Sequence, residues 1–441
     1  MPGFIPKCKA IHPNFPPEIW QQIFHFATHV PDILTPEIYH HSAFIGYIFN
    51  RRHHPAIRNS LVTKRHLVRV CKTWYILASP YLYKSVYLGR GRCLSSICST
   101  VMTSAQGKAI ISGSNPLGWY TERLDVAMRD QDSAHGDAEL EFLAEIIRCM
   151  PNLAIVSFAA RYPQYGHKEM PSSVMDALMS HALSLRVVDW STDRLVPNES
   201  SYLELLRSAT NLRILNCFLA SSSESDNCHA FNPSLQTLSL PDLFIDDGDY
   251  QIHLPSVHEV LFVGDDNLWR KNDFLKIYGA NITSLHLFPS NFDLRIYSEH
   301  CPRLHSLIIS VDEWVSLPLN LVLPPVSYLG LRCDRYQASM SIYAHIFAVL
   351  DSFRRSAPSL RVVQFVERQN VVDILKKFQI QRLLEQFKDC QFRIEDHDGH
   401  LLWHGADKFY HHECVLTPCR LPITMGRLVS AGVLIQKSIS G

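Results

Sequence analysis

The sequence has little that would mark a nucleic-acid-binding or membrane protein. Its 42 lysines and arginines are balanced by 42 aspartates and glutamates, so it lacks the basic excess that sequence-independent nucleic-acid binding requires. It has no uninterrupted apolar run of the roughly 18 residues that a membrane-spanning helix needs. The first residues carry prolines and charges but no apolar core of a signal peptide. We therefore expect no nucleic acid, no membrane and a cytoplasmic or nuclear location.

Motifs for chemistry are also scarce. The 12 cysteines form no C-x-x-C pair, which is typical of a reducing compartment. The chain has no glycine-rich phosphate loop, no G-x-S-x-G elbow and no H-E-x-x-H zinc motif. We expect a protein that is not an enzyme and that needs no cofactor. Wholesale disorder is excluded, because 46% of the residues are hydrophobic and only 19% are charged, which is enough to form a large core.

One short pattern recurs along the chain: an apolar residue, then apolar residues three and five positions later. Successive copies start 22 to 34 residues apart, mostly within the period of strand-and-helix repeats. The nine copies are Leu153/Val156/Phe158, Leu185/Val188/Trp190, Leu212/Leu215/Cys217, Leu235/Leu238/Leu240, Val257/Val260/Phe262, Ile282/Leu285/Leu287, Leu304/Leu307/Ile309, Val326/Leu329/Leu331 and Leu360/Val363/Phe365.

The spacing has a structural meaning. Positions +3 and +5 are two residues apart, so they point to one face of a short strand. Helical patterns lie between copies, as in 139–147 and 341–350. Residues 120–370 resemble a degenerate leucine-rich repeat, which implies an irregular solenoid with one parallel sheet. Residues 120–126 keep only part of the pattern and are expected to be the capping strand. The predicted fold class is thus α/β.

The N-terminal part shows two helical patterns. Phe15-Pro16-Pro17-Glu18-Ile19 reads as a helix start, because proline suits the first helical position and glutamate the positive end of the helix dipole. A second pattern covers 63–78 and places Leu67, Cys71, Trp74, Ala78 and Tyr81 on one face of a single helix. Ser79-Pro80 is expected to break or redirect it.

These parts resemble the F-box of fungal F-box-like proteins. The matching segments are Phe15–Ile19, Val70-Cys71-Lys72-Thr73-Trp74 and Leu77-Ala78-Ser79-Pro80-Tyr81-Leu82-Tyr83. The sequence departs from the family in Phe15, which replaces a leucine, and in a long insert near 28–59 between the helical blocks. The domains expected are an F-box-like module at 1–90, a linker at 91–119, the repeats at 120–370 and a cap with a helix and a hairpin at 371–441.

The resemblance implies partners and not chemistry. An F-box docks on a Skp-type adaptor that hangs from a cullin scaffold, and the repeats then present a protein substrate for ubiquitin transfer. No RING-type or HECT-type cysteine pattern is present, so the chain is not expected to transfer ubiquitin itself. The residues that the resemblance assigns to the adaptor-facing and core set are Phe15, Pro16, Ile19, Ile23, Leu67, Val70, Cys71, Trp74 and Leu77. The alternative is that these apolar residues only hold a small helical bundle together.

Alternate residues of each repeat strand should face the concave side of the solenoid, where a substrate could bind. The face has aromatic anchors and few cations, which suits a protein ligand. The predicted substrate face comprises Asp189, Asn216, Phe218, Glu259, His286, Phe288, Tyr328 and Arg332. In the alternative, the chain's own C-terminus covers the apolar members of this face.

The C-terminal region holds the residues most typical of metal ligands, His397, His400, His404, His411, His412, Cys414 and Cys419. No two of its cysteines have zinc-finger spacing. Asp398-Gly399 instead favours a hairpin turn with surface histidines, and no metal is expected. The sequence thus predicts a substrate-recognition subunit of a cullin-type ubiquitin ligase. The alternative is a non-catalytic repeat scaffold that acts outside ubiquitin ligation.

Overall fold

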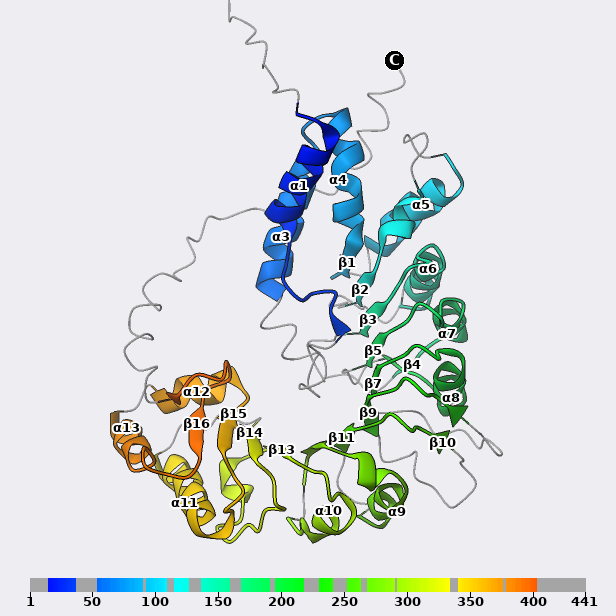
Figure 1. Cartoon of the computed structure of the whole chain (residues 1–441). Coiled ribbons are helices and arrows are strands. Elements are labelled where there is room, and N and C mark those ends of the chain that lie inside the picture. Colours follow the sequence, from blue (N-terminus) through cyan, green and yellow to red (C-terminus); the bar gives the residue numbers. More distant parts are fainter. Residues whose placement is uncertain are drawn as a thin grey trace, which may run out of the picture.

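A computed structural model shows strands lining the inner side of an arc and helices covering its outer side (Figure 1). It describes residues 15–36, 54–89, 93–108, 115–126, 136–158, 168–190, 195–217, 230–240, 252–262, 268–289, 292–333, 340–375 and 378–402. Within these ranges, every helix is too short or too polar to cross a bilayer.

A single long sheet runs through the described part of the chain. Its strands pair in parallel and follow one another in chain order, as in a solenoid. The twelve strands are β1 (Ser85–Leu88), β2 (Arg123–Val126), β3 (Ile155–Phe158), β5 (Val187–Trp190), β7 (Ile214–Cys217), β9 (Thr237–Leu240), β11 (Glu259–Phe262), β12 (Ser284–Leu287), β13 (Ser306–Val311), β14 (Tyr328–Cys333), β15 (Val362–Phe365) and β16 (Arg393–Glu395). The sheet is open, and the α/β class with one parallel sheet is confirmed.

The register of the sheet matches the repeat pattern. The +3 residues of all nine triplets form one continuous row of paired positions. That row reads Val156, Val188, Leu215, Leu238, Val260, Leu285, Leu307, Leu329 and Val363. Because side chains alternate along a strand, the +3 and +5 residues all face the helices. The triplets therefore supply the residues of the sheet that belong to the core. β2 is a further strand before them, but the expectation that it caps the sheet was wrong, because β1 pairs with it and forms the edge.

Helices cover the outer side of many of the repeats (Figure 1). They are α5 (Leu94–Ala105), α6 (Gly136–Arg148), α7 (Ser172–Met179), α8 (Glu199–Ser208), α9 (Leu268–Tyr278), α10 (Arg295–His300) and α11 (Met340–Ser356). Their apolar residues and the triplets form one continuous core. Within it the rings of Phe158 and Trp190 stack at 5.7 Å, so neighbouring repeats also contact each other through aromatic rings. Two small sheets, β4 (Lys168–Glu169) with β6 (Leu195–Val196) and β8 (Ala230–Phe231) with β10 (Ile252–His253), flank the main one.

Three helices precede the repeats and pack against one another: α1 (Pro17–Thr28), α3 (His54–Leu67) and α4 (Lys72–Lys84). The single helix predicted over 63–78 was wrong, because the chain turns at 68–70 and Cys71 is extended. Pro80 was expected to break the helix, yet it lies inside α4. The local penalty is about 3 kcal/mol for a proline in a helix interior, and α4 keeps its course because it packs against α1, α3 and η3 (Leu117–Tyr120).

Two other segments differ from expectation. Residues 91–119 were expected to be a linker but contain α5, whose Leu94, Cys98 and Val101 are buried in the core beside α6. The 3-10 helix η3 (Leu117–Tyr120) follows it. At the other end, the one capping helix expected over 371–390 is split into α12 (Arg368–Leu375) and α13 (Phe378–Glu385). The expected turn at Asp398-Gly399 is present, with an antiparallel bridge between Glu395 and Leu401.

Gly118 marks a close contact between η3 and the end of α6. A Cβ atom at this position would lie 2.0 Å from the backbone oxygen of Cys149. We expect Gly118→Ala to lower the free energy of unfolding by about 1–3 kcal/mol, because the backbone must shift to admit the methyl group. Urea denaturation measures the loss. Gly89→Ala is the matched control, since its nearest neighbour is the movable ring of Tyr87. Equal stability of the two variants would contradict the prediction.

Candidate functional site

Helix α1 carries an exposed apolar stripe. Ile19, Ile23 and Phe26 are spaced four and three residues apart, so they lie on one face of the helix. Their exposed fractions are 39%, 42% and 79%. We call these three residues the α1 stripe. Phe15, just before the helix, is also exposed at 48%. A helix face of this kind lacks the apolar partner that usually buries it in a globular protein.

An adjoining side of α1 is anchored to α4. The ring of Trp74 lies 4.7 Å from that of Trp20 and 4.8 Å from that of Phe24, so α1 and α4 share an aromatic cluster. The hydroxyl group of Tyr81 donates a hydrogen bond of 3.0 Å to the backbone oxygen of Gln21. Because both helices are fixed in this way, the α1 stripe is presented on a rigid support.

The residues predicted to face an adaptor separate into two groups. Phe15, Pro16, Ile19, Ile23, Val70 and Cys71 are exposed. Leu67, Trp74 and Leu77 are half-buried, and Trp74 packs inside the module as the alternative interpretation held. Cys71 does not belong to a core. Its Sγ atom accepts the backbone N–H of Trp74 at 3.5 Å and caps α4.

The sequence interpretation missed further exposed apolar residues of the same module. Phe26 extends the α1 stripe by one turn and could have been found from its spacing to Ile19 and Ile23. Val62 on α3 and Ile76 on α4 are about half exposed, at 52% and 47%. No periodic signal distinguishes these two, because their exposure depends on how the three helices pack.

The predicted substrate face needs correction. Its polar members Asp189, Asn216, Glu259, His286 and Arg332 are all buried. Phe288 and Tyr328 are half-buried, and Phe218 lies outside the described residues. The alternation of side chains placed these residues on the inner face correctly, but an inner-face position does not imply contact with solvent. Five of the eight residues are therefore not available as direct contacts in this structure.

Hydrogen bonds between neighbouring strands use these inner polar groups. The hydroxyl of Ser157 donates to Asp189 at 3.0 Å, that of Ser239 donates to Asn216 at 3.0 Å, and that of Thr237 donates to Glu259 at 3.1 Å. A buried polar group without such a bond would destabilise the fold. These pairs stabilise the inner side of the sheet.

Two of the buried groups have strongly shifted acidities. Burial raises the pKa of Glu259 well above its ordinary value, and the hydrogen bond from Thr237 opposes the shift. Burial lowers the pKa of His286 well below its ordinary value, and the nearby charge of Arg332 adds to the effect. His286 is therefore neutral at physiological pH, and its Nε2 lies 2.8 Å from the Ser310 hydroxyl.

The N-terminal part of the chain covers part of the inner face. Ile57 on α3 is buried against Ile155, Val187 and Ile214 of three successive strands, and Ile33 packs on the same cluster. A polar contact lies beside this apolar cluster: Nη1 of Arg123 on β2 donates a hydrogen bond of 2.8 Å to the backbone oxygen of Ile33. Arg123 in turn forms a two-bond ion pair with Asp125. The module is thus fixed to the first strands of the sheet.

Metal-binding potential in the described residues is confined to one small group. Asp396, Asp398 and His400 bring their ligand atoms within 4.8 Å of one another. The turn itself explains the clustering, since Oδ1 of Asp396 accepts the backbone N–H groups of Asp398 and His400 at 2.8 and 2.9 Å. His404 and the later histidines and cysteines lie outside the described residues.

Comparison of the chain with known protein families gives no match, and comparison with curated proteins gives none either. The site is therefore defined by its own geometry: a rigid helical module that exposes the α1 stripe, attached to one end of an open parallel solenoid (Figure 1).

Proposed function

We propose that the protein is a substrate-recognition subunit of a cullin-type ubiquitin ligase, with its N-terminal helices bound to a Skp-type adaptor. The resemblance of these helices to an F-box suggests the partner. The observation that carries the proposal is the α1 stripe, an apolar helix face without a partner in the described part of the chain. The protein acts by binding, and it carries out no chemistry of its own.

The geometry favours a protein partner for this face. Apolar residues at i, i+4 and i+7 are the anchors with which a helix docks into an apolar groove. The chain supports them from behind with the aromatic cluster of Trp20, Phe24 and Trp74, so little order has to be gained on binding.

The repeat region would hold the protein substrate. Because most of the inner polar residues are buried, we place the contact at the half-buried aromatic residues Phe288 and Tyr328 and not at the polar row. Phe218 remains a predicted contact. The junction with the N-terminal module lies at the other end of the sheet, so adaptor and substrate would occupy separate parts of the arc.

The adaptor site can be tested with two charges placed on the α1 stripe. In Ile19→Asp/Ile23→Asp, affinity of the full-length chain for a fungal Skp-type adaptor should fall at least about 100-fold, since central apolar anchors each contribute about 1–2 kcal/mol or more. Isothermal titration calorimetry measures the affinity. The full chain is required, because Ile33 and Ile57 pack on the sheet and the module is not independent of it.

The control is Ile277→Asp, the same change at a residue of α9 that is 71% exposed. It should leave adaptor binding unchanged, and all three proteins should melt at similar temperatures because the altered side chains are exposed. If the wild-type chain does not bind the adaptor, a repeat scaffold outside ubiquitin ligation becomes the better interpretation. If Ile277→Asp lost as much affinity for the adaptor as Ile19→Asp/Ile23→Asp, the α1 stripe would not be the contact.

A further inference from the structure

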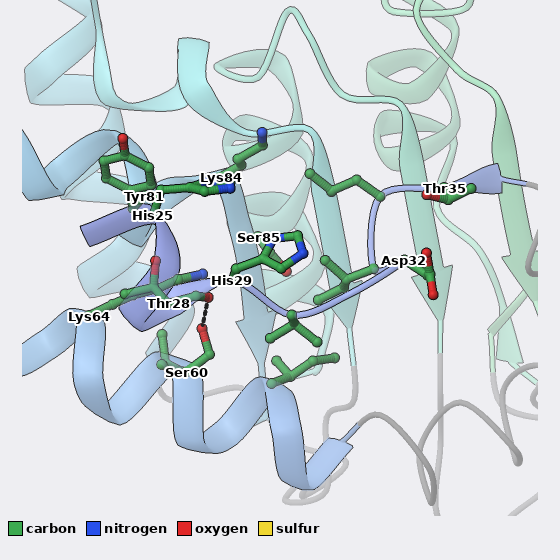
Figure 2. A pocket seen from close by; sticks show the side chains of 15 residues that line it. His25, Thr28, His29, Asp32, Thr35, Ser60, Lys64, Tyr81, Lys84 and Ser85 are labelled. Atoms are coloured by element: carbon green, nitrogen blue, oxygen red, sulfur yellow. Dashed lines mark hydrogen bonds between the residues drawn. The ribbon is translucent and has the colours of Figure 1, made fainter. Parts of the chain in front are cut away.

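A cavity of about 170 Å³ lies where the N-terminal helices meet the first strand of the sheet. Its lining comes from the end of α1, the segment after it, α3, and the junction of α4 with β1 (Figure 2). A water molecule occupies about 30 Å³ in the liquid, so the cavity has room for an ion several times larger than water. Neither the repeat pattern nor the F-box resemblance predicts it.

Lys64 is the most unusual residue of this cavity. It lies on α3, it lines the cavity, and only 9% of its surface is exposed. Figure 2 shows its side chain directed into the pocket near Thr28 and His29. A buried ammonium group is costly unless an anion or several acceptors accompany it. Burial and the charge of Lys84 lower the pKa of Lys64 to about 8.

The hydroxyl groups of the lining differ in whether they already have a partner. The hydroxyl groups of Thr28, Ser60 and Tyr81 already donate to backbone oxygens at 2.7, 2.5 and 3.0 Å. The hydroxyl of Ser85 has no such partner, although Ser85 is only 6% exposed. The imidazole rings of His25 and His29 also line the cavity and lie 5.1 Å apart.

The charges of the lining are unequal. Lys64 and Lys84 both contribute to it, and Lys84 lies 3.4 Å from Glu122. Asp32 is the one carboxylate in the lining, and in Figure 2 it lies at the opposite end of the pocket from Lys64. The part of the cavity away from Asp32 therefore combines the charge of Lys64 with the unpartnered hydroxyl of Ser85, an environment that suits an oxyanion.

We propose that this cavity binds a small oxyanion of the phosphate class. Lys64 supplies the charge, and Ser85 and the nearby imidazoles donate hydrogen bonds to the oxygen atoms. Because these residues come from α1, α3 and the start of β1, the bound ion would hold the N-terminal module against the sheet. The proposal does not depend on adaptor binding, and the two can fail separately.

The test uses thermal unfolding of the full-length chain in millimolar inorganic phosphate against chloride of equal ionic strength. Phosphate should raise the melting temperature, because a ligand that binds only the folded state stabilises it. Glycerol 3-phosphate in a parallel series distinguishes free phosphate from the phosphate group of a monoester. Affinity follows from titration calorimetry. A melting temperature that rises no more in phosphate than in chloride would overturn the proposal.

Two variants identify the site. Lys64→Met should weaken phosphate binding at least about tenfold, because it removes the charged hydrogen-bond donor. Ser85→Ala removes a hydroxyl without a partner and should weaken binding while the fold is kept, which covers the case of a poorly folded Lys64 variant. Lys276→Met, at an exposed lysine paired with Asp273 at 2.7 Å, should bind like the wild type. Unchanged affinity in both Lys64→Met and Ser85→Ala would refute the assignment.

Discussion

Replacing Asp125 by alanine is expected to lower the free energy of unfolding by about 3–5 kcal/mol, because it leaves the charge of Arg123 buried without its counter-ion. Both groups are inaccessible, with side-chain exposures of 0% for Arg123 and 6% for Asp125. Two bonds join them, Nε to Oδ2 at 2.8 Å and Nη2 to Oδ1 at 2.6 Å. Urea denaturation of the purified full-length chain measures the loss.

The chain offers a matched control for this experiment. Asp293 and Arg295 form the same two-bond pair, also two residues apart, with a shortest distance of 2.6 Å, but both side chains are exposed. Asp293→Ala should change stability little, because water solvates the remaining guanidinium group. In Arg123→Met/Asp125→Leu, which removes both charges, part of the stability lost in Asp125→Ala should return. A loss in Asp125→Ala no larger than in Asp293→Ala would show that burial of the pair is not what stabilises this region.

Replacing Lys64 by methionine is expected to raise the free energy of unfolding at pH 7 by about 2–3 kcal/mol. The folded-state pKa of Lys64 is lowered from 10.5 to about 8, so its charged form is disfavoured in the folded protein. Each pKa unit corresponds to about 1.4 kcal/mol. Methionine has a similar length and no charge, so it fills the same space without the desolvation cost.

The pH dependence follows from the same shift. Below pH 8 Lys64 is protonated in both the folded and the unfolded state, and the wild type is destabilised by the full free-energy cost of burying the charged ammonium group. Between pH 8 and 10.5 the unfolded state binds more protons than the folded state, so the stability of the wild type rises with pH. The difference in free energy of unfolding between Lys64→Met and the wild type therefore shrinks over this range. Urea denaturation of both proteins in chloride buffer at a series of pH values measures the difference. An advantage that stays constant up to pH 10.5 would contradict the assignment to Lys64.

The sequence predicted the repeat region well because its signal is local. The +3 and +5 residues of each triplet are neighbours in the chain, and their alternation alone determines which side of a strand faces the helices. The parallel sheet and its register follow, from Val156 to Val363. The helix break at 68–70 could not be read in the same way. Leu67, Cys71 and Trp74 satisfy the spacing of one continuous helix, yet packing of α3 and α4 on α1 requires two.

The candidate site was only partly accessible to sequence reasoning. The α1 stripe could be predicted from Ile19 and Ile23, because helical spacing places them on one face. Burial of Asp189, Asn216 and His286 could not, because the alternation of side chains gives the face of a residue and not what covers it. The cavity around Lys64 depends on four segments whose sequences carry no shared pattern.

By itself the sequence determined a stack of parallel strand-and-helix repeats, because every repeat encodes the same short-range alternation and cannot bury its apolar side alone. Only the tertiary structure decided that the N-terminal helices fold back onto the inner face. Ile57 meets Ile155 about a hundred positions further along the chain, and Arg123 meets the backbone oxygen of Ile33. Such contacts follow from complementary shape and charge between distant segments, and no periodicity within either segment specifies them.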